Sequence, residues 1–169
     1  EIATLARALK HMLDQREANA QRMLQYRQLV EGSEDLMAIA DEHYRYLLVN
    51  DAYAKAFGRE RSRVEGAFIW ELLGEQYFEA EAKARLDRCL AGQPEHYETR
   101  RRHADGYERD LLVRYFPITP SSDGQRQVVA VITDISELKQ AERQGREQAH
   151  LLDIAGRIAR FGGWRVDFA

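Results

Sequence analysis

The sequence has little cysteine, little proline, no long apolar run and almost no net charge, and each shortage excludes a class of protein. The single cysteine, Cys89, leaves no internal disulfide framework and no multi-cysteine zinc or iron–sulfur site, which fits a reducing compartment. A net charge of −3 gives no bulk attraction to nucleic acid or to anionic lipid. We therefore expect a cytoplasmic protein that does not bind nucleic acid.

The apolar runs are also shorter than the roughly 20 residues that a membrane span needs. The first residues lack a basic stretch followed by an apolar segment, so no signal peptide is expected. This segment is therefore not expected to contact a membrane. Because it starts with glutamate and not with methionine, we expect it to be part of a longer protein.

All 3 prolines fall between residues 94 and 120, which leaves the start of the chain free to be helical. Residues 1–31 place apolar side chains at seven-residue spacing among Arg, Glu, Gln, Lys and Ala. Such a narrow stripe needs a partner, and strict heptad spacing favours a second identical helix. The sequence therefore predicts a parallel coiled-coil homodimer. The apolar seam residues are Ile2, Leu5, Leu9, Met12, Met23, Tyr26 and Val30.

Two polar residues, Arg16 and Asn19, interrupt this seam. A single buried polar layer can fix the register and the number of helices, although it lowers stability. The alternative is that the two residues only let the middle of the coil fray. The heptad pattern is compatible with both arrangements.

Residues 32–136 differ in texture and predict an α+β domain. Two strands come first, helices follow, and three strands end the domain. This order favours a five-stranded antiparallel sheet with the short helices on one face. Asn50 is the expected N-cap of the first short helix. The predicted strands cover 36–40, 44–49, 95–103, 107–118 and 126–134, with a helix at 52–57, a helical turn at 61–65 and a longer helix at 78–90.

The last two predicted strands are apolar on both faces. An antiparallel sheet with one face in water would alternate cleanly between apolar and polar residues, so something must cover the back of this sheet. We expect the cover to be an amphipathic flanking helix, from the same chain or from its partner. The alternating residues are Leu111, Val113 and Tyr115 against Leu112, Arg114 and Phe116, and Val128, Ala130 and Ile132 against Val129, Val131 and Thr133.

A second long helix is predicted at 137–160, directly after the last strand. Ser136 is its candidate N-cap, and Glu137 places negative charge where the helix dipole favours it. The apolar seam of this helix is poorer than that of the first and contains a glycine, which lowers helix propensity. Residues 161–169 alternate as a strand would, so we expect them to begin a further, truncated domain.

Six short motifs follow one another through the middle of the chain. They are Val-Asn-Asp-Ala-Tyr at 49–53, Phe-Gly at 57–58, Arg-Val-Glu-Gly at 63–66, Asp-Gly at 105–106, Phe-Pro-Ile at 116–118 and Asp-Ile-Ser-Glu at 134–137. Together they resemble a PAS domain, the small sensory module of bacterial signalling proteins, over about residues 29–142. A further set of residues after 154 resembles the start of a second PAS domain. The resemblance implies a tandem-PAS parent such as a sensor kinase or a diguanylate cyclase.

The resemblance also implies a pocket between the sheet and the short helices, which some members fill with haem, flavin or a small metabolite. Flavin-binding members use a cysteine in the helix after the second strand, but residues 68–76 contain none and Cys89 comes too late. Haem-binding members place a histidine on the long helix, but residues 78–90 contain none. No haem, flavin or metal is therefore expected, and a small organic ligand is the remaining option.

Aromatic and aliphatic side chains form an ordinary filled core more often than a cavity, so a filled core is expected. Arg101 is expected outside the core, paired with Glu98, Glu108 or Asp110. Turned inward, it would need an anionic partner and would indicate a carboxylate ligand. The residues that could line a pocket are Tyr53, Phe57, Trp70, Arg101, Leu111, Val113, Tyr115 and Ile132.

Together these features predict a sensing and dimerisation module of a two-component type of signalling protein. Asp134, Ser136 and Glu137 would form the junction that passes a ligand- or partner-induced change into the C-terminal helix. Its partners would be a second copy and neighbouring PAS and output domains. The alternative is a ligand-free spacer that dimerises and transmits strain from elsewhere. No enzymatic role is expected, because His11 lacks the context of a phosphoacceptor and no phosphate loop or nucleophile–base pair occurs.

Overall fold

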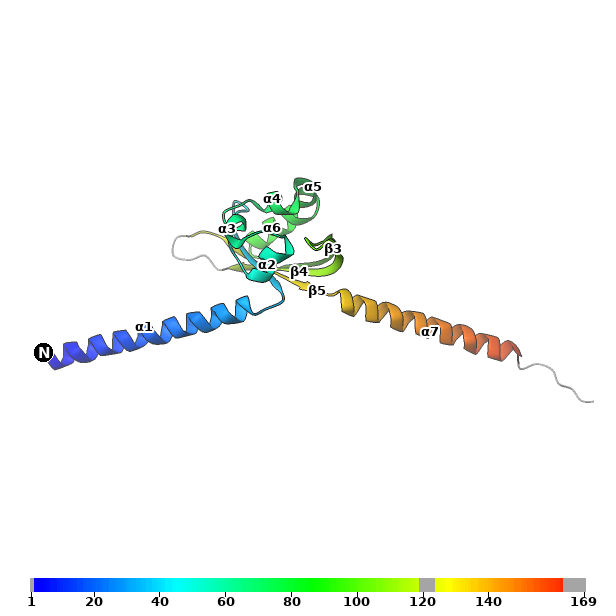
Figure 1. Ribbon diagram of the computed structural model, residues 1–169, viewed down its shortest axis with the longest axis horizontal. Helices are drawn as coiled ribbons and strands as arrows, with labels where there is room; N and C mark the ends of the chain where they lie inside the picture. Colours follow the sequence, from blue (N-terminus) through cyan, green and yellow to red (C-terminus); the bar gives the residue numbers. More distant parts are fainter. Residues whose placement is uncertain (1, 119–123, 163–169) are drawn as a thin grey trace, which may run out of the picture.

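The computed structural model describes the chain at residues 2–118 and 124–162, and its side chains at 15–118 and 124–157. Two long helices, α1 (Ile2–Glu31) and α7 (Ser136–Gly162), flank a small α+β domain. They leave it in opposite directions (Figure 1). Among the described helices, none is long and apolar enough to cross a membrane.

The expected antiparallel sheet is confirmed, with five strands in the order β2-β1-β5-β4-β3. Because β1 and β5 are neighbours, the first and last strands of the domain meet inside the sheet. The segments that follow α1 and precede α7 therefore lie side by side. The strands are β1 (Leu36–Asp41), β2 (Tyr46–Val49), β3 (Glu95–Arg102), β4 (Glu108–Ile118) and β5 (Gln127–Asp134).

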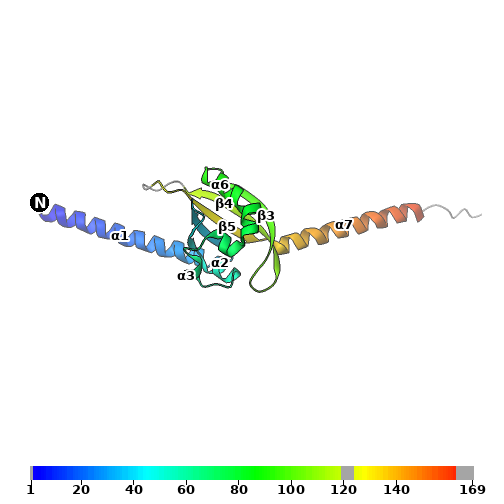
Figure 2. The same ribbon diagram turned by 90° about the horizontal axis from the view of Figure 1, so that it is seen from above.

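Short helices cover one face of the sheet, which we call the inner face (Figures 1 and 2). The continuous helix expected at 78–90 is wrong in its first part, because η1 (Phe78–Ala82) is a π-helical turn. Both ends of this wider turn are buried in the core. The other elements of the layer are α2 (Asp51–Ala56), α3 (Arg61–Val64), α4 (Ile69–Leu73), α5 (Glu75–Tyr77) and α6 (Lys83–Leu90).

Asn50 caps α2 and is buried. Its Oδ1 accepts hydrogen bonds from the backbone N–H groups of Tyr53 and Met37, both at 3.0 Å. Its Nδ2 donates to the carbonyl oxygens of Val30 at 3.1 Å and Asp35 at 2.9 Å. One side chain thus joins the end of α1, strand β1 and the first helix of the inner layer.

The second strand begins two residues later than expected, because Tyr44 belongs to the preceding turn. The Asp41 carboxylate closes this turn, and Tyr44 adopts a left-handed backbone with φ of +62°. Its ring packs edge-on against Phe78, with 5.2 Å between ring centres, and its hydroxyl donates to Asp87. Burial and this bond raise the pKa of Tyr44 to about 12. The turn therefore fastens the first hairpin to the helix layer.

The other, outer face of the sheet lacks the cover expected for it among the described residues. Leu48 is 52% exposed and Phe116 is 43% exposed on this face. The described part of α1 also exposes a row of large apolar side chains, Met23, Leu24, Tyr26 and Leu29. The apolar outer face and the apolar side of α1 are thus both left without a partner among the residues whose side chains are described.

Candidate functional site

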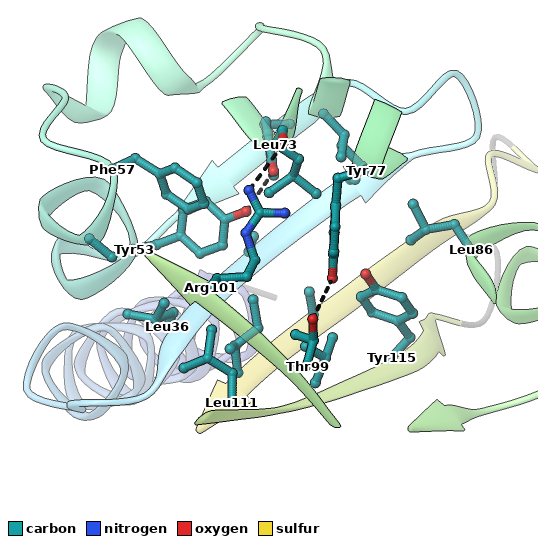
Figure 3. A pocket seen from close by; sticks show the side chains of 18 of the residues that line it. Leu36, Tyr53, Phe57, Leu73, Tyr77, Leu86, Thr99, Arg101, Leu111 and Tyr115 are labelled. Carbon is teal, nitrogen blue, oxygen red and sulfur yellow. Dashed lines mark hydrogen bonds between the residues drawn. The ribbon is translucent and has the colours of Figure 1, made fainter. Parts of the chain in front are cut away.

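A cavity of about 50 Å³ lies between the inner face and the helix layer (Figure 3). The sequence favours a filled core, but the core of the structure contains a small cavity. Trp70 does not line it, because its ring stacks on Phe68 with 4.3 Å between ring centres. Seven of the eight proposed pocket residues do line it, namely Tyr53, Phe57, Arg101, Leu111, Val113, Tyr115 and Ile132.

Arg101 points into this cavity, so the expectation that it pairs outside the core is wrong. Strand alternation places it on the same side of β3 as Tyr97 and Thr99, all of them half-buried. One guanidinium nitrogen donates to the carbonyl oxygen of Leu73 at 3.0 Å, and the guanidinium carbon lies 4.0 Å from the centre of the Tyr77 ring. No carboxylate of the described residues pairs with Arg101 within 4.0 Å.

Tyrosine hydroxyls gather around the same space. Burial raises the pKa of Tyr46, Tyr53, Tyr97 and Tyr115 far above neutral pH. These phenols therefore stay uncharged, so they can donate hydrogen bonds but cannot neutralise the guanidinium. The hydroxyl oxygens are 2.5 Å apart for Tyr46 and Tyr53, 3.1 Å for Tyr97 and Tyr115, and 3.3 Å for Tyr77 and Tyr97.

Flavin and haem do not fit this cavity. Pockets for such ligands measure roughly 300 Å³ or more. Cys89 is buried in the core and does not line the cavity, and burial raises the pKa of its thiol to about 11, so it is no ready nucleophile. His103 does line the cavity, and burial lowers its pKa. The described residues contain no cluster of side chains suited to a metal ion.

The predicted junction lies where β5 passes into α7. The Ser136 N–H donates to the Asp134 carboxylate at 2.9 Å. The Ser136 hydroxyl accepts from the Asp110 N–H at 3.0 Å, so it binds β4 and does not cap α7 as expected. The Ile135 N–H donates to the Asp110 carbonyl oxygen at 2.8 Å, whereas Glu137 is exposed in the first turn. The junction is therefore held to the start of β4.

Asp110 is a central residue of this junction that sequence reasoning missed. Its carboxylate accepts from Arg100 at 2.8 and 3.0 Å and from Arg143 of α7 at 2.7 Å. The bond from Arg100, with the charge of Arg143, holds the pKa of Asp110 below its usual value. Lys139 of α7 also pairs with Glu98 of β3 at 2.7 Å. We call these three ion pairs, Arg100–Asp110, Arg143–Asp110 and Lys139–Glu98, the α7 latch.

A signal for Asp110 was present in the predicted strand order. Antiparallel pairing of the last two strands places the start of β4 beside the end of β5, as in the pair of Leu111 and Asp134. Any acidic residue at the start of β4 therefore lies next to the junction. Sequence reasoning considered Asp110 only as a partner for an exposed arginine.

Strand β3 connects the cavity with the α7 latch. Thr99 and Arg101 face the cavity, whereas Glu98 and Arg100 are exposed on the opposite side and carry the latch. Successive residues of a strand point to opposite faces, so the two sites share one backbone. A displacement of this strand necessarily moves both.

The exposed side of α1 borders a groove of about 720 Å³ against the outer face. Met23, Tyr26 and Val30 of the predicted seam lie in its wall. The other seam residues, Ile2, Leu5, Leu9 and Met12, lie outside the residues whose side chains are described. The sheet contributes Met37, Ile39, Leu48 and Val129 to the groove.

Comparison with known proteins places this architecture. A family model described as the PAS fold matches residues 30–140. The solved PAS domain of the HTR-like protein from Haloarcula marismortui superimposes with a TM-score of 0.57 at 21% identity, over 75% of this chain and 99% of that one.

Two curated proteins are similar in sequence. The chain is 30% identical over 128 residues to the C4-dicarboxylate transport sensor protein DctS of Rhodobacter capsulatus, covering 75% of this chain and 20% of that protein. It is 26% identical over 149 residues to the methanogenesis regulatory histidine kinase FilI of Methanothrix harundinacea, covering 83% of this chain and 16% of that protein. The chain thus spans a fifth or less of the length of either relative.

Proposed function

This chain belongs to the PAS-fold family, and from that premise we propose that it is the sensing and dimerisation module of a larger signalling protein. The observation that carries the proposal is β3, whose inner residues line the cavity and whose outer residues carry the α7 latch. A ligand or partner that displaces this strand changes the ion pairs that hold the first turns of α7 to the sheet. Asp134 and Ser136 then pass the change into the helix.

The energetics suit such a relay. A ligand shifts two arrangements only by the difference between its affinities for them, and coupling between sites is typically about 1–3 kcal/mol. The α7 latch consists of exposed ion pairs, which are weak and are screened by salt. A small bias is therefore enough to alter its occupancy.

We assign four segments to the chain. A dimerising helix at 1–31 precedes a PAS domain at 32–136, and an output helix follows at 137–160. Residues 161–169, of which 163–169 lie outside the described residues, are assigned to the start of a further PAS domain. The names of the two curated relatives, a transport sensor and a regulatory histidine kinase, support a sensor-kinase parent. The neighbouring PAS and output domains of the same chain are then the partners of α7.

The dimer is proposed to form through α1 and the outer face. Among the described residues, the exposed Met23 and Tyr26 of the seam border the groove that the outer face also lines. A second copy of α1 carries an apolar stripe that can pack against this surface, and pairing would bury both. The uncovered outer face thus supports a second copy as the occupant.

Hydrogen exchange of the purified chain tests the relay. Replacing Lys139 and Arg143 by alanine removes the two α7 partners of the latch. Because coupling is reciprocal, we expect faster amide exchange in β3 as well as in the first turns of α7. The matched control replaces Arg146 and Arg157, whose exposed pairs lie within α7. Unchanged exchange in β3 of the latch variant would overturn the relay.

The spacer alternative is tested separately by native mass spectrometry. A sensing module is expected to give the mass of two chains together with a small bound molecule, or to take one up when it is supplied. A dimer that binds no added compound and still shows the coupled exchange would instead be a spacer.

A further inference from the structure

We propose that the cavity binds a monocarboxylate of one to three carbons, with the carboxylate on Arg101. The inference deepens the proposed sensing function, because it names the class of ligand that would displace β3. Its effect on signalling rests on that proposed function. It depends on the charge, the hydrogen-bond donors and the size of the cavity. Each of these is fixed by described residues.

The charge of the cavity is positive and unbalanced. The guanidinium of Arg101 has a backbone carbonyl and the face of Tyr77 as its described contacts, and neither carries a negative charge. An inward charge without a counterion is unfavourable, and a carboxylate matches the planar fork of an arginine. His103 is uncharged at neutral pH because burial lowers its pKa. Arg102 also borders the cavity, but its side chain is 70% exposed and pairs with Glu108. Arg101 is thus the inward-facing cation available to a ligand in the described cavity.

Arginine carries five N–H donors, and one of those of Arg101 has a described acceptor, the carbonyl oxygen of Leu73. Tyr46 and Tyr53 add a second donor site. Their two hydroxyls share one bond at 2.5 Å, so one O–H of the pair is left to donate. The hydroxyl of Tyr53 points toward the guanidinium in Figure 3. An anion between them would accept from both groups.

The size of the cavity limits the ligand. A cavity needs a volume of roughly 10–15 Å³ to hold one water molecule, which is about the size of one non-hydrogen atom of a ligand. The observed volume of about 50 Å³ therefore holds about three to five non-hydrogen atoms, which matches formate, acetate or propionate. Leu111, Val113 and Ile132 line the same space and suit a methyl or ethyl group. A dicarboxylate would leave its second charge beside these apolar side chains, so it is disfavoured.

Titration of the isotope-labelled chain with sodium acetate, followed by amide NMR shifts, tests the proposal. The energy available per atom limits a four-atom ligand to a dissociation constant no tighter than about 40 μM, so we expect values near about 1 mM. Sodium chloride at equal ionic strength screens the α7 latch to the same extent, so it is the reference, and acetate should shift the amides of β3 beyond the shifts seen with chloride. Acetamide, which has the same shape without the charge, should bind about 10- to 100-fold more weakly.

The matched variants are Arg101→Met and Arg102→Met. Arg102 is the next residue of β3, but its side chain is 70% exposed and pairs with Glu108. We expect the first variant to lose acetate binding and the second to keep it, with circular dichroism confirming that both fold. If Arg101→Met does not fold, the acetate and acetamide comparison on the unaltered chain still decides. Equal affinity for acetate and acetamide, no shifts with acetate beyond those with chloride, or tighter binding of succinate would overturn the proposal.

The two proposals fail in different ways. The variant without Lys139 and Arg143 keeps the cavity, so it should bind acetate even if β3 exchange shows no coupling. Conversely, absence of acetate binding leaves the exchange result of the relay experiment unchanged. The ligand class and the relay are therefore tested independently.

Discussion

The two faces of the sheet have similar apolar strand patterns but different environments. The inner face is closed by the helix layer of the same chain, and Val113 and Tyr115 there are 3% and 5% exposed. The outer face leaves Phe116, the next residue of β4, 43% exposed. The described part of one chain therefore covers only one of the two faces of its sheet. In the dimer proposed above, folding and assembly would therefore use opposite faces of the sheet.

The largest expected effect comes from exchanging a ring for a methyl group on each face. Tyr115→Ala should lower the free energy of unfolding by about 3–5 kcal/mol, because it opens a large hole in the core. Phe116→Ala should cost about 1–2 kcal/mol, since that ring is 43% exposed to water already. Urea denaturation at a concentration where the chain is monomeric checks this. Equal losses for the two variants would show that the faces do not differ.

A smaller loss of folding free energy is expected at Asn50, which joins the end of α1 to β1 and α2. Asn50→Ala removes four hydrogen bonds and leaves buried backbone groups unpaired, so it should lower the free energy of unfolding by about 2–4 kcal/mol. Asn50→Asp is the control, because it keeps the two accepted bonds and loses the two donated ones. A loss with aspartate as small as that of a surface change would contradict the role of the donated bonds.

The outer face can be tested through assembly. Tyr26→Glu places a charge on the exposed apolar side of α1 and should weaken self-association about tenfold or more. Tyr107→Glu is the matched control, because Tyr107 is 72% exposed but lies in the hairpin turn before β4. Sedimentation equilibrium gives both constants. Equal weakening by the two changes would place the interface elsewhere.

The smallest effect concerns the end of α1. Burial alone would raise the pKa of Glu31, but bonds from Arg61 and from the Asp51 N–H outweigh it and lower the pKa below the usual 4.5. The stabilisation is therefore complete above about pH 4.5 and is lost as the pH falls through the lower, folded-state pKa. We expect the melting temperature of Glu31→Gln to fall less between about pH 5.5 and about pH 3 than that of the unaltered chain. Parallel acid curves would refute this.

The succession of strands and helices along the chain could be predicted, because alternation and turn residues are local signals. Asn50 followed the same logic, since a cap sits beside the helix that it caps. The turn at Tyr44 was missed because a left-handed tyrosine is stabilised by distant partners such as Phe78 and Asp87. Local propensity does not contain those contacts.

The site was predictable in membership but not in orientation. Alternation alone placed Arg101 with Tyr97 and Thr99, yet the charge of arginine favoured an outward position. The ring of Tyr77 and the carbonyl of Leu73 reverse that preference, and both belong to helices whose position on the sheet is a tertiary property. Asp110 was missed for the same reason, because its partners lie on two other elements, β3 and α7.

The length of α7 makes it a lever. At 1.5 Å per residue, its 27 residues extend about 40 Å from the junction. A tilt of about 5° at the base therefore carries the far end sideways through about 3.5 Å. Movements at Asp110 too small to disturb the core would thus be enlarged at the far end of α7.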